Sequence, residues 1–269
     1  MGKFTGVLLA SDFDDTFVGR RTESVSPENL KALEYFKSQG GTFTIATGRS
    51  YTTFLPQLYR CPVNAPVVLS NGAMGYDFAE EREIYRTELP LRCVEDIRTL
   101  MAALPNVAFE ACHGEDIYVH NPNRVTELHL KKVGVPYTLS AIEDIPLPWI
   151  KVLFEESHEG LEKVQRFMLE NFGDVYELVF SNKVLLEMTA KNCHKGSGVL
   201  QVAALKGIVS ENIFTVGDNC NDISMFNIAR MGFAPADCAA EVKDSGATLV
   251  SSSDEHAIAD VIEIIDKMY

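Results

Sequence analysis

Short apolar runs separated by turn-forming residues mark the first quarter of the chain. The runs GVLLA, TFTIAT and APVVLS lie at residues 6–10, 42–47 and 65–70, bounded by Gly, Pro and Asn. Each run predicts a short buried strand, and the segment around residues 50–59 predicts a helix between the second and third strands.

The segment SPENLKALEYFKSQGG, between the first two runs, predicts another helix. Ser26 is placed as its N-cap, Pro27 stands at the first helical position, and a glycine pair follows its end. Leu30, Leu33 and Phe36 recur at helical spacing, so we expect them on one face of the helix. The order strand, helix, strand, helix, strand predicts a parallel α/β sheet.

The last third of the chain repeats this order. A helix is predicted at Lys195 to Leu205, a strand in NIFTV, a second helix at Asp222 to Met231, a strand in ATLVS and a closing amphipathic helix at Glu255 to Tyr269. Both ends of the chain therefore predict halves of one Rossmann-like parallel sheet flanked by helices.

The middle of the chain follows a different pattern. Two helix-like segments, 90–105 and 158–173, accompany strand-like segments with two-residue alternation at 107–112, 116–120, 149–156, 174–180 and 183–189. This mixture predicts an inserted α+β cap domain with an antiparallel sheet. The expected division is a discontinuous core at 1–85 and 188–269, with the cap at 86–187.

Composition narrows the functional class. The 269 residues are 46 % apolar and 23 % charged, with a formal net charge of -14 that argues against nucleic acid or an anionic membrane as partner. The first apolar run lacks the features of a signal peptide or a spanning helix, so a cytoplasmic protein is expected. Six cysteines without a CxxC pair favour reduced thiols over a zinc site or disulfides.

Polar clusters follow four of the predicted strands. They read SDFDDT, TGRS, SNGA and GDNCND, and the carboxyl ends of strands in an open parallel sheet are where ligands bind. Each cluster alone is also typical of a turn, a helix cap or an Asx-rich loop. An EF-hand is excluded, since Phe17 stands where that loop needs glycine.

Together and in this order, the clusters resemble the four motifs of the haloacid dehalogenase superfamily. The matching residues are Asp12, Asp14 and Thr16, then Thr47, then Lys195, and finally Gly217, Asp218, Asn221 and Asp222. The insertion and SNGA resemble the Cof-type subgroup with a C2 (type IIB) cap. Asp15 and the stretch APADCA at 234–239 depart from the usual pattern, although neither supplies a reacting group.

This resemblance implies a phosphatase that works through an aspartyl phosphate. A carboxylate attacks a phosphate dianion only when a cation offsets their repulsion, which explains a run of acids beside a strand. The resemblance implies Mg²⁺ held by Asp12, the Asp14 carbonyl and Asp218. Asp222 would act through a bound water or by orienting the groups that hold the ion. Asp12 would be the nucleophile and Asp14 the general acid and base.

The resemblance also implies the substrate side of the site. Thr47, Gly48, Lys195 and Asn221 would bind the transferring phosphoryl group, while Arg49 either contacts substrate or pairs with an acid. The expected partner is a small phosphorylated metabolite, with sugar phosphates the commonest kind among similar proteins.

Several points stay open at this stage. A phosphomutase and a non-catalytic phosphometabolite-binding protein are the alternatives. His113, Asp116, Tyr118 and Glu187 are polar groups on cap strands, but alternation leaves open which of them face the pocket. Cys220 and His194 receive no role, and the sequence does not indicate an oligomeric state.

Overall fold

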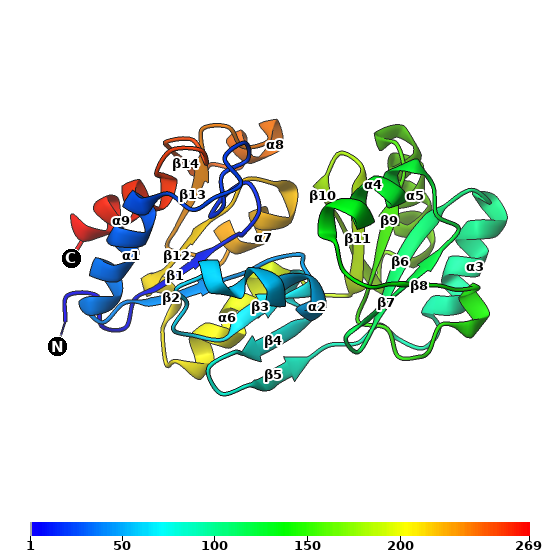
Figure 1. Cartoon of the computed structure of the whole chain (residues 1–269), viewed down its shortest axis with the longest axis horizontal. Coiled ribbons are helices and arrows are strands. Elements are labelled where there is room, and N and C mark those ends of the chain that lie inside the picture. Colours follow the sequence, from blue (N-terminus) through cyan, green and yellow to red (C-terminus); the bar gives the residue numbers. More distant parts are fainter. Residues whose placement is uncertain (1) are drawn as a thin grey trace.

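Two bodies lie side by side in the computed structural model, which describes residues 2–269 (Figure 1). The first holds a five-stranded sheet in the order β14-β13-β12-β1-β2, and all of its pairs are parallel. Its strands are β1 (Leu8–Ser11), β2 (Thr42–Ile45), β12 (Ile213–Val216), β13 (Met231–Pro235) and β14 (Thr248–Val250). The predicted joining of the two chain ends in one parallel sheet is confirmed.

Helices cover both faces of this sheet because β1 is apolar on both sides. Leu9 packs in one cluster with residues of α1 (Pro27–Ser38) and α9 (Ala257–Asp266), whereas Leu8 and Ala10 pack with α6 (Lys195–Leu205). Ser26 caps α1 as predicted, since its side chain accepts a hydrogen bond from the Asn29 N–H at 3.1 Å. Leu33 and Phe36 of this helix are buried, whereas the Leu30 side chain is exposed.

Two predicted helices are shorter than expected. The segment 50–59 forms α2 (Tyr51–Phe54) and then a 3₁₀ turn, η1 (Leu55–Arg60), in which Pro56 cannot donate a helical hydrogen bond. The segment 222–231 contains only the short turn η5 (Cys220–Asp222) and α7 (Ile223–Phe226), because Met231 already begins the unpredicted strand β13. The short helix α8 (Ala240–Lys243) and the turn η4 (Ser210–Asn212) complete this part of the chain.

The third predicted strand lies outside the central sheet. β3 (Val67–Leu69) pairs antiparallel with β4 (Met74–Asp77), which pairs with β5 (Arg82–Arg86); only one parallel bridge, Ala46 to Val68, links β3 to the end of β2. The turn η2 (Ser70–Gly72) has positive φ throughout and reverses the chain into this hairpin. The prediction that β3 extends the parallel sheet is therefore wrong.

The second body is the predicted α+β cap. Its sheet has the order β10-β11-β9-β6-β7-β8, antiparallel except for the β7–β8 pair. The strands are β6 (Ala108–His113), β7 (Asp116–His120), β8 (Thr138–Leu139), β9 (Lys151–Glu155), β10 (Tyr176–Asn182) and β11 (Leu185–Ala190). The domain boundaries stay a prediction; β11 runs through the expected boundary at residue 187.

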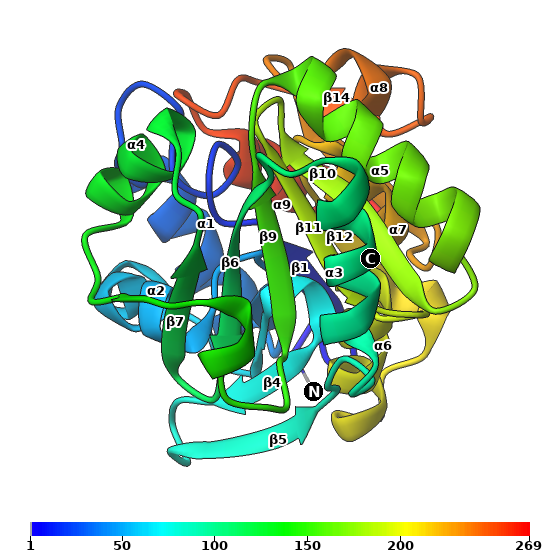
Figure 2. The same cartoon turned by 90° about the vertical axis from the view of Figure 1, so that its right-hand side faces the viewer.

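The two faces of the cap sheet differ in chemistry. α3 (Cys93–Ala103) and α5 (His158–Phe172) cover the outer face, in the foreground of Figure 2, and pack on Val152 and Phe154. The other strand positions turn polar side chains toward the core. On this inner side lies α4 (Arg124–Val133), which the sequence did not predict and which begins with a capping box at Asn123. The turn η3 (Ile142–Asp144) precedes β9.

Two further expectations concern the whole chain. All six cysteines are free thiols, as predicted. Within residues 2–269, no helix has the length and apolar character needed to cross a membrane.

Candidate active site

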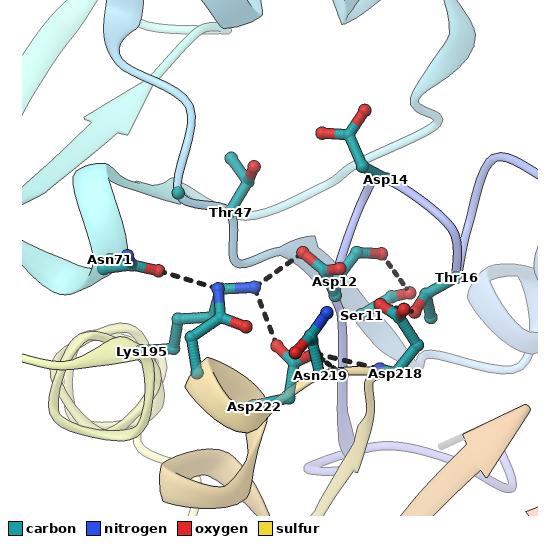
Figure 3. A network of polar contacts seen from close by, with 12 residues as sticks. Ser11, Asp12, Asp14, Thr16, Thr47, Asn71, Lys195, Asp218, Asn219 and Asp222 are labelled. Carbon is teal, nitrogen blue, oxygen red and sulfur yellow. Dashed lines mark hydrogen bonds and ion pairs between the residues drawn. The ribbon is translucent and has the colours of Figure 1, made fainter. Parts of the chain in front are cut away.

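The polar clusters of the sequence meet at one edge of the central sheet, as Figure 3 shows. Asp12 and Asp14 follow β1, Thr47 follows β2, Asp218 and Asp222 follow β12, and Lys195 opens α6. Parallel strands end at a common edge, so residues far apart in sequence become neighbours there.

Lys195 lies at the centre of this group. Its ammonium donates to Asp12 Oδ1 at 2.6 Å and to Asp222 Oδ1 at 2.7 Å, and its side chain is 1 % exposed. Burial opposes the charged form, but the two carboxylates outweigh it and raise the pKa of Lys195. Burial likewise raises the pKa of Asp12 to about 7, against the pull of Lys195. Lys195 therefore fixes the orientation of Asp12 and supplies positive charge beside it.

Asp222 holds the loop after β12 in place. Its Oδ2 accepts the backbone N–H groups of Asp218 at 2.9 Å and Asn219 at 3.0 Å, while Oδ1 accepts from Lys195. A Cβ on Gly217 would come within 2.3 Å of the Asp222 side chain, which explains glycine there. Because both oxygens of Asp222 are engaged, it orients the loop and Lys195.

Asp218 is bound by residues from the first loop. It accepts hydrogen bonds from Thr16 Oγ1 at 3.2 Å and from Arg20 at 2.9 Å. Burial, reinforced by Asp12, raises the pKa of Asp218. Arg20, which sequence reasoning missed, also donates to Asp15 at 3.1 Å and to the Asp237 carbonyl at 2.7 Å. Of the two departures from the usual motif pattern, Asp15 binds Arg20 through its side chain, whereas the Asp237 side chain accepts hydrogen bonds from Ser253.

The acidic cluster has the chemistry of a site for a hard divalent cation. Carboxylate oxygens of Asp12, Asp218 and Asp222 lie within 4.8 Å of one another, and all three residues are buried. Buried carboxylates this close repel one another unless a cation or proton lies between them, and Mg²⁺ prefers oxygen ligands. The residues present thus fit Mg²⁺, with Asp12 and Asp218 best placed to bind it directly.

Asp14 is turned away from this cluster (Figure 3) and its carboxylate pairs with Arg49. Two hydrogen bonds of 2.7 Å join the guanidinium to the two carboxylate oxygens, and Arg49 also donates to the Thr53 carbonyl at 3.1 Å. The guanidinium lies 5.4 Å from the centre of the Phe13 ring. Of the two roles left open for Arg49, this arrangement shows the pairing with an acid.

Thr47, Gly48 and Asn221, three of the predicted phosphate-binding residues, line the same cavity, which has a volume of about 210 Å³. Lys195 is buried next to it and bound to the lining residue Asp12. Thr47 Oγ1 accepts a hydrogen bond from the backbone N–H of Arg49 at 3.1 Å, which leaves the hydroxyl proton of Thr47 free to donate. Asn221 donates to Asn71 Oδ1 at 3.1 Å. Gly48 lies under the cap, where a Cβ would come within 2.4 Å of Glu187 Oε1. The structure brings all nine predicted site residues to this region.

The cap closes the cavity through Lys151 and Glu187. Lys151 Nζ donates to Glu187 at 2.7 Å and to the carbonyl of Gly48, in the core, at 2.6 Å. Thr52 of the core also donates to the Glu115 carbonyl of the cap. Of the four polar cap residues singled out from the sequence, only Glu187 lines this cavity. Lys151 lies on an alternating strand, a signal that could have placed it beside Glu187.

The comparison with protein families decides the assignment. The model of the haloacid dehalogenase-like hydrolases matches residues 9–262, which includes every site residue described above. The chain belongs to this family of hydrolases. The resemblance seen in the sequence motifs is therefore confirmed.

Two curated relatives match nearly the whole chain. They are 5-amino-6-(5-phospho-D-ribitylamino)uracil phosphatases from Escherichia coli, 24 % identical over 97 % of this chain and 96 % of the relative, and from Bacillus subtilis, 25 % identical over 95 % and 96 %.

Solved structures support the fold. A subclass IIB sugar phosphatase of the superfamily has a TM-score of 0.86 at 23 % identity, covering 96 % of this chain and 98 % of that one. A haloacid dehalogenase-like hydrolase from B. subtilis has a TM-score of 0.82 at 24 % identity, covering 95 % and 98 %.

Proposed function

We propose that this hydrolase is a cytoplasmic, Mg²⁺-dependent phosphatase of small phosphomonoesters. The observation that carries the proposal is the group of Asp12, Lys195, Asp218 and Thr47 at the base of a cavity that the cap closes. A cavity of about 210 Å³ admits a small phosphate ester but no folded phosphoprotein.

The reaction begins at Asp12. Its free carboxylate oxygen bonds to phosphorus as the ester P–O bond breaks, giving an aspartyl phosphate and an alkoxide. Lys195 and Thr47 donate to the phosphoryl oxygens, which carry the charge of the transition state. Bound Mg²⁺ supplies charge neutralisation between the two anions. Water then attacks phosphorus and releases inorganic phosphate and free Asp12.

Asp14 moves the protons in both steps. It gives a proton to the departing alkoxide and later takes one from the attacking water. In the present arrangement its carboxylate is held by Arg49 and directed away from Asp12. Substrate entry must therefore be accompanied by rotation of the Asp14 side chain out of the Arg49 pair.

A polyhydroxylated leaving group fits the cavity best. The inner wall of the cap presents Glu110, His129, Lys151 and Glu187, which are hydrogen-bonding groups suited to hydroxyls. Two relatives are named for a phosphorylated ribityl chain, and one similar structure is of a sugar phosphatase. We therefore place the substrate among sugar and sugar-alcohol phosphates.

The test replaces the nucleophile. Asp12→Asn should abolish phosphate release from p-nitrophenyl phosphate while circular dichroism and the cooperativity of unfolding stay unchanged. EDTA should silence the native protein and Mg²⁺ restore it. Substantial turnover by Asp12→Asn, or indifference to EDTA, would contradict the proposal. Formation of an isomeric sugar phosphate without release of phosphate would identify a mutase instead.

A further inference from the structure

A second cluster of potential metal ligands lies in the cap, apart from the three aspartates of the core. Glu110 on β6, Glu155 on β9 and His129 on α4 place one ligand atom each within 4.8 Å of one another. The two glutamates lie on the inner face because alternate residues of their strands fill the outer face with Phe109 and Phe154.

The carboxylates of this cluster are buried without hydrogen bonds. Glu155 is fully buried and Glu110 is 5 % exposed. Both oxygens of Glu155, and Oε1 of Glu110, have no hydrogen-bond partner among residues 2–269. Burying a carboxylate in this way is costly unless a cation or a proton compensates it. The cluster therefore needs a compensating positive charge.

The nearby lysine is already committed elsewhere. Lys151 Nζ binds Glu187 at 2.7 Å and the Gly48 carbonyl at 2.6 Å, so its charge is balanced by Glu187. Burial and the proximity of Lys151 lower the pKa of His129 to about 4, which leaves its imidazole neutral at physiological pH. Neutral imidazole is the form that binds metals. With both glutamates ionised the cluster carries two negative charges, which one divalent cation would neutralise in place of the protons.

The distances fit a shared ion. His129 Nε2 lies 3.9 Å from Glu110 Oε1. Two ligands of one ion at about 2.1 Å are separated by roughly 3 to 4 Å, so small side-chain rotations suffice. Glu110 and His129 line the cavity, which gives an ion a route of entry and leaves coordination positions open to it.

We propose that Glu110, His129 and Glu155 form a divalent-cation site in the cap, distinct from the Mg²⁺ site of the core. A set of two carboxylates and one imidazole favours Mn²⁺ or Zn²⁺ over Mg²⁺. The ion joins α4 to β6 and β9, and so fixes one wall of the cavity. This site goes beyond the proposed phosphatase function and stands or falls independently of it.

The test counts bound Mn²⁺ on the full chain by electron paramagnetic resonance. The double variant Asp12→Asn/Asp218→Asn removes two carboxylates of the core cluster and should still bind one Mn²⁺ per chain. Adding Glu155→Gln should weaken that binding at least about tenfold. The matched control is Glu127→Gln, which removes an exposed carboxylate from α4 and should leave binding unchanged.

A second measurement avoids the core variants in case they unfold. In the otherwise native protein, Glu155→Gln should lower the number of bound Mn²⁺ ions from two to one. The visible spectrum of bound Co²⁺ should change in His129→Gln, since an imidazole ligand is lost. Equal Mn²⁺ counts with and without Glu155, or a Co²⁺ spectrum indifferent to His129, would overturn the proposal and indicate that the glutamates share a proton.

Discussion

Lys195→Met tests the claim that one buried ammonium holds the site together. The substitution keeps a straight side chain of similar length but removes the charge that Asp12 and Asp222 share. The Lys195 side chain is 1 % exposed and that of Asp222 is 0 % exposed. Breaking a buried pair by removing one partner costs about 3 to 5 kcal/mol.

The expected loss lies near the lower end of that range. Asp222 keeps two hydrogen bonds from the backbone N–H groups of Asp218 and Asn219, so it is not left alone. We therefore expect the free energy of unfolding to fall by about 3 kcal/mol, measured by urea denaturation at neutral pH in EDTA, so that no divalent ion replaces the lost charge.

Lys206→Met is the matched control, because it removes an exposed lysine at the C-cap of the same helix. Its effect should stay within about 0.5 kcal/mol. Combining Lys195→Met with Asp12→Asn should cost less than the sum of the single changes, by about 1 to 3 kcal/mol. Equal losses for Lys195→Met and Lys206→Met, or simple additivity in the double variant, would refute the reasoning.

Three further outcomes are expected. Asp14→Asn should slow hydrolysis of alkyl phosphates far more than of p-nitrophenyl phosphate, since only alkoxides need its proton, and equal losses of kcat would remove Asp14 from that role. Lys151→Met should raise KM about tenfold by loosening the cap, because one hydrogen bond to a charged group is worth about 1.5–3 kcal/mol. Lys131→Met, at an exposed lysine, should leave KM unchanged, and an unchanged KM in Lys151→Met would contradict the prediction. Burial raises the pKa of Glu110 to about 7 and of Glu155 to about 8, so the stability that their protonated forms contribute in EDTA is complete below pH 4.5 and is lost as pH rises through 7 and 8. The free energy of unfolding of the native protein relative to Glu155→Gln, measured by urea denaturation, should therefore fall over that range; a difference that does not vary with pH would count against it.

The sequence predicted the core site well because its geometry follows from sheet topology. Asp12, Thr47 and Asp218 each follow a strand, and Lys195 begins a helix whose bounds match the prediction. Strands of a parallel sheet end at one edge, so recognising the strands was enough to bring these residues together. The exception in this region was β3, where a left-handed turn at Asn71 starts a hairpin that periodicity does not reveal.

The sequence predicted the sheet and the two outer helices of the cap but missed its inner wall, where contacts depend on packing between elements. α4 was missed, and with it His129, since its last turn carries two lysines and its apolar positions are few. Arg20 lies in a loop without periodicity, and its partner Asp218 is distant in sequence. Such contacts are fixed by tertiary structure, and no local pattern encodes them.

The fixed charges around the cavity support the proposal that this site binds an anion together with a divalent ion. Four cationic side chains around the cavity are each paired with at least one carboxylate: Arg20, Arg49, Lys151 and Lys195. A fifth, Lys132 of α4, lines the cap side of the cavity. Lys195 serves both Asp12 and Asp222, so carboxylates exceed cations even before substrate enters. A phosphate dianion bound at Asp12 adds negative charge where the neighbouring cations, Lys195 and Arg49, are already paired with carboxylates. The deficit is local, and the net charge of -14 is largely screened at this range. Under the proposed function, a metal ion in the acidic cluster would therefore be a condition for substrate affinity as well as for the chemical step.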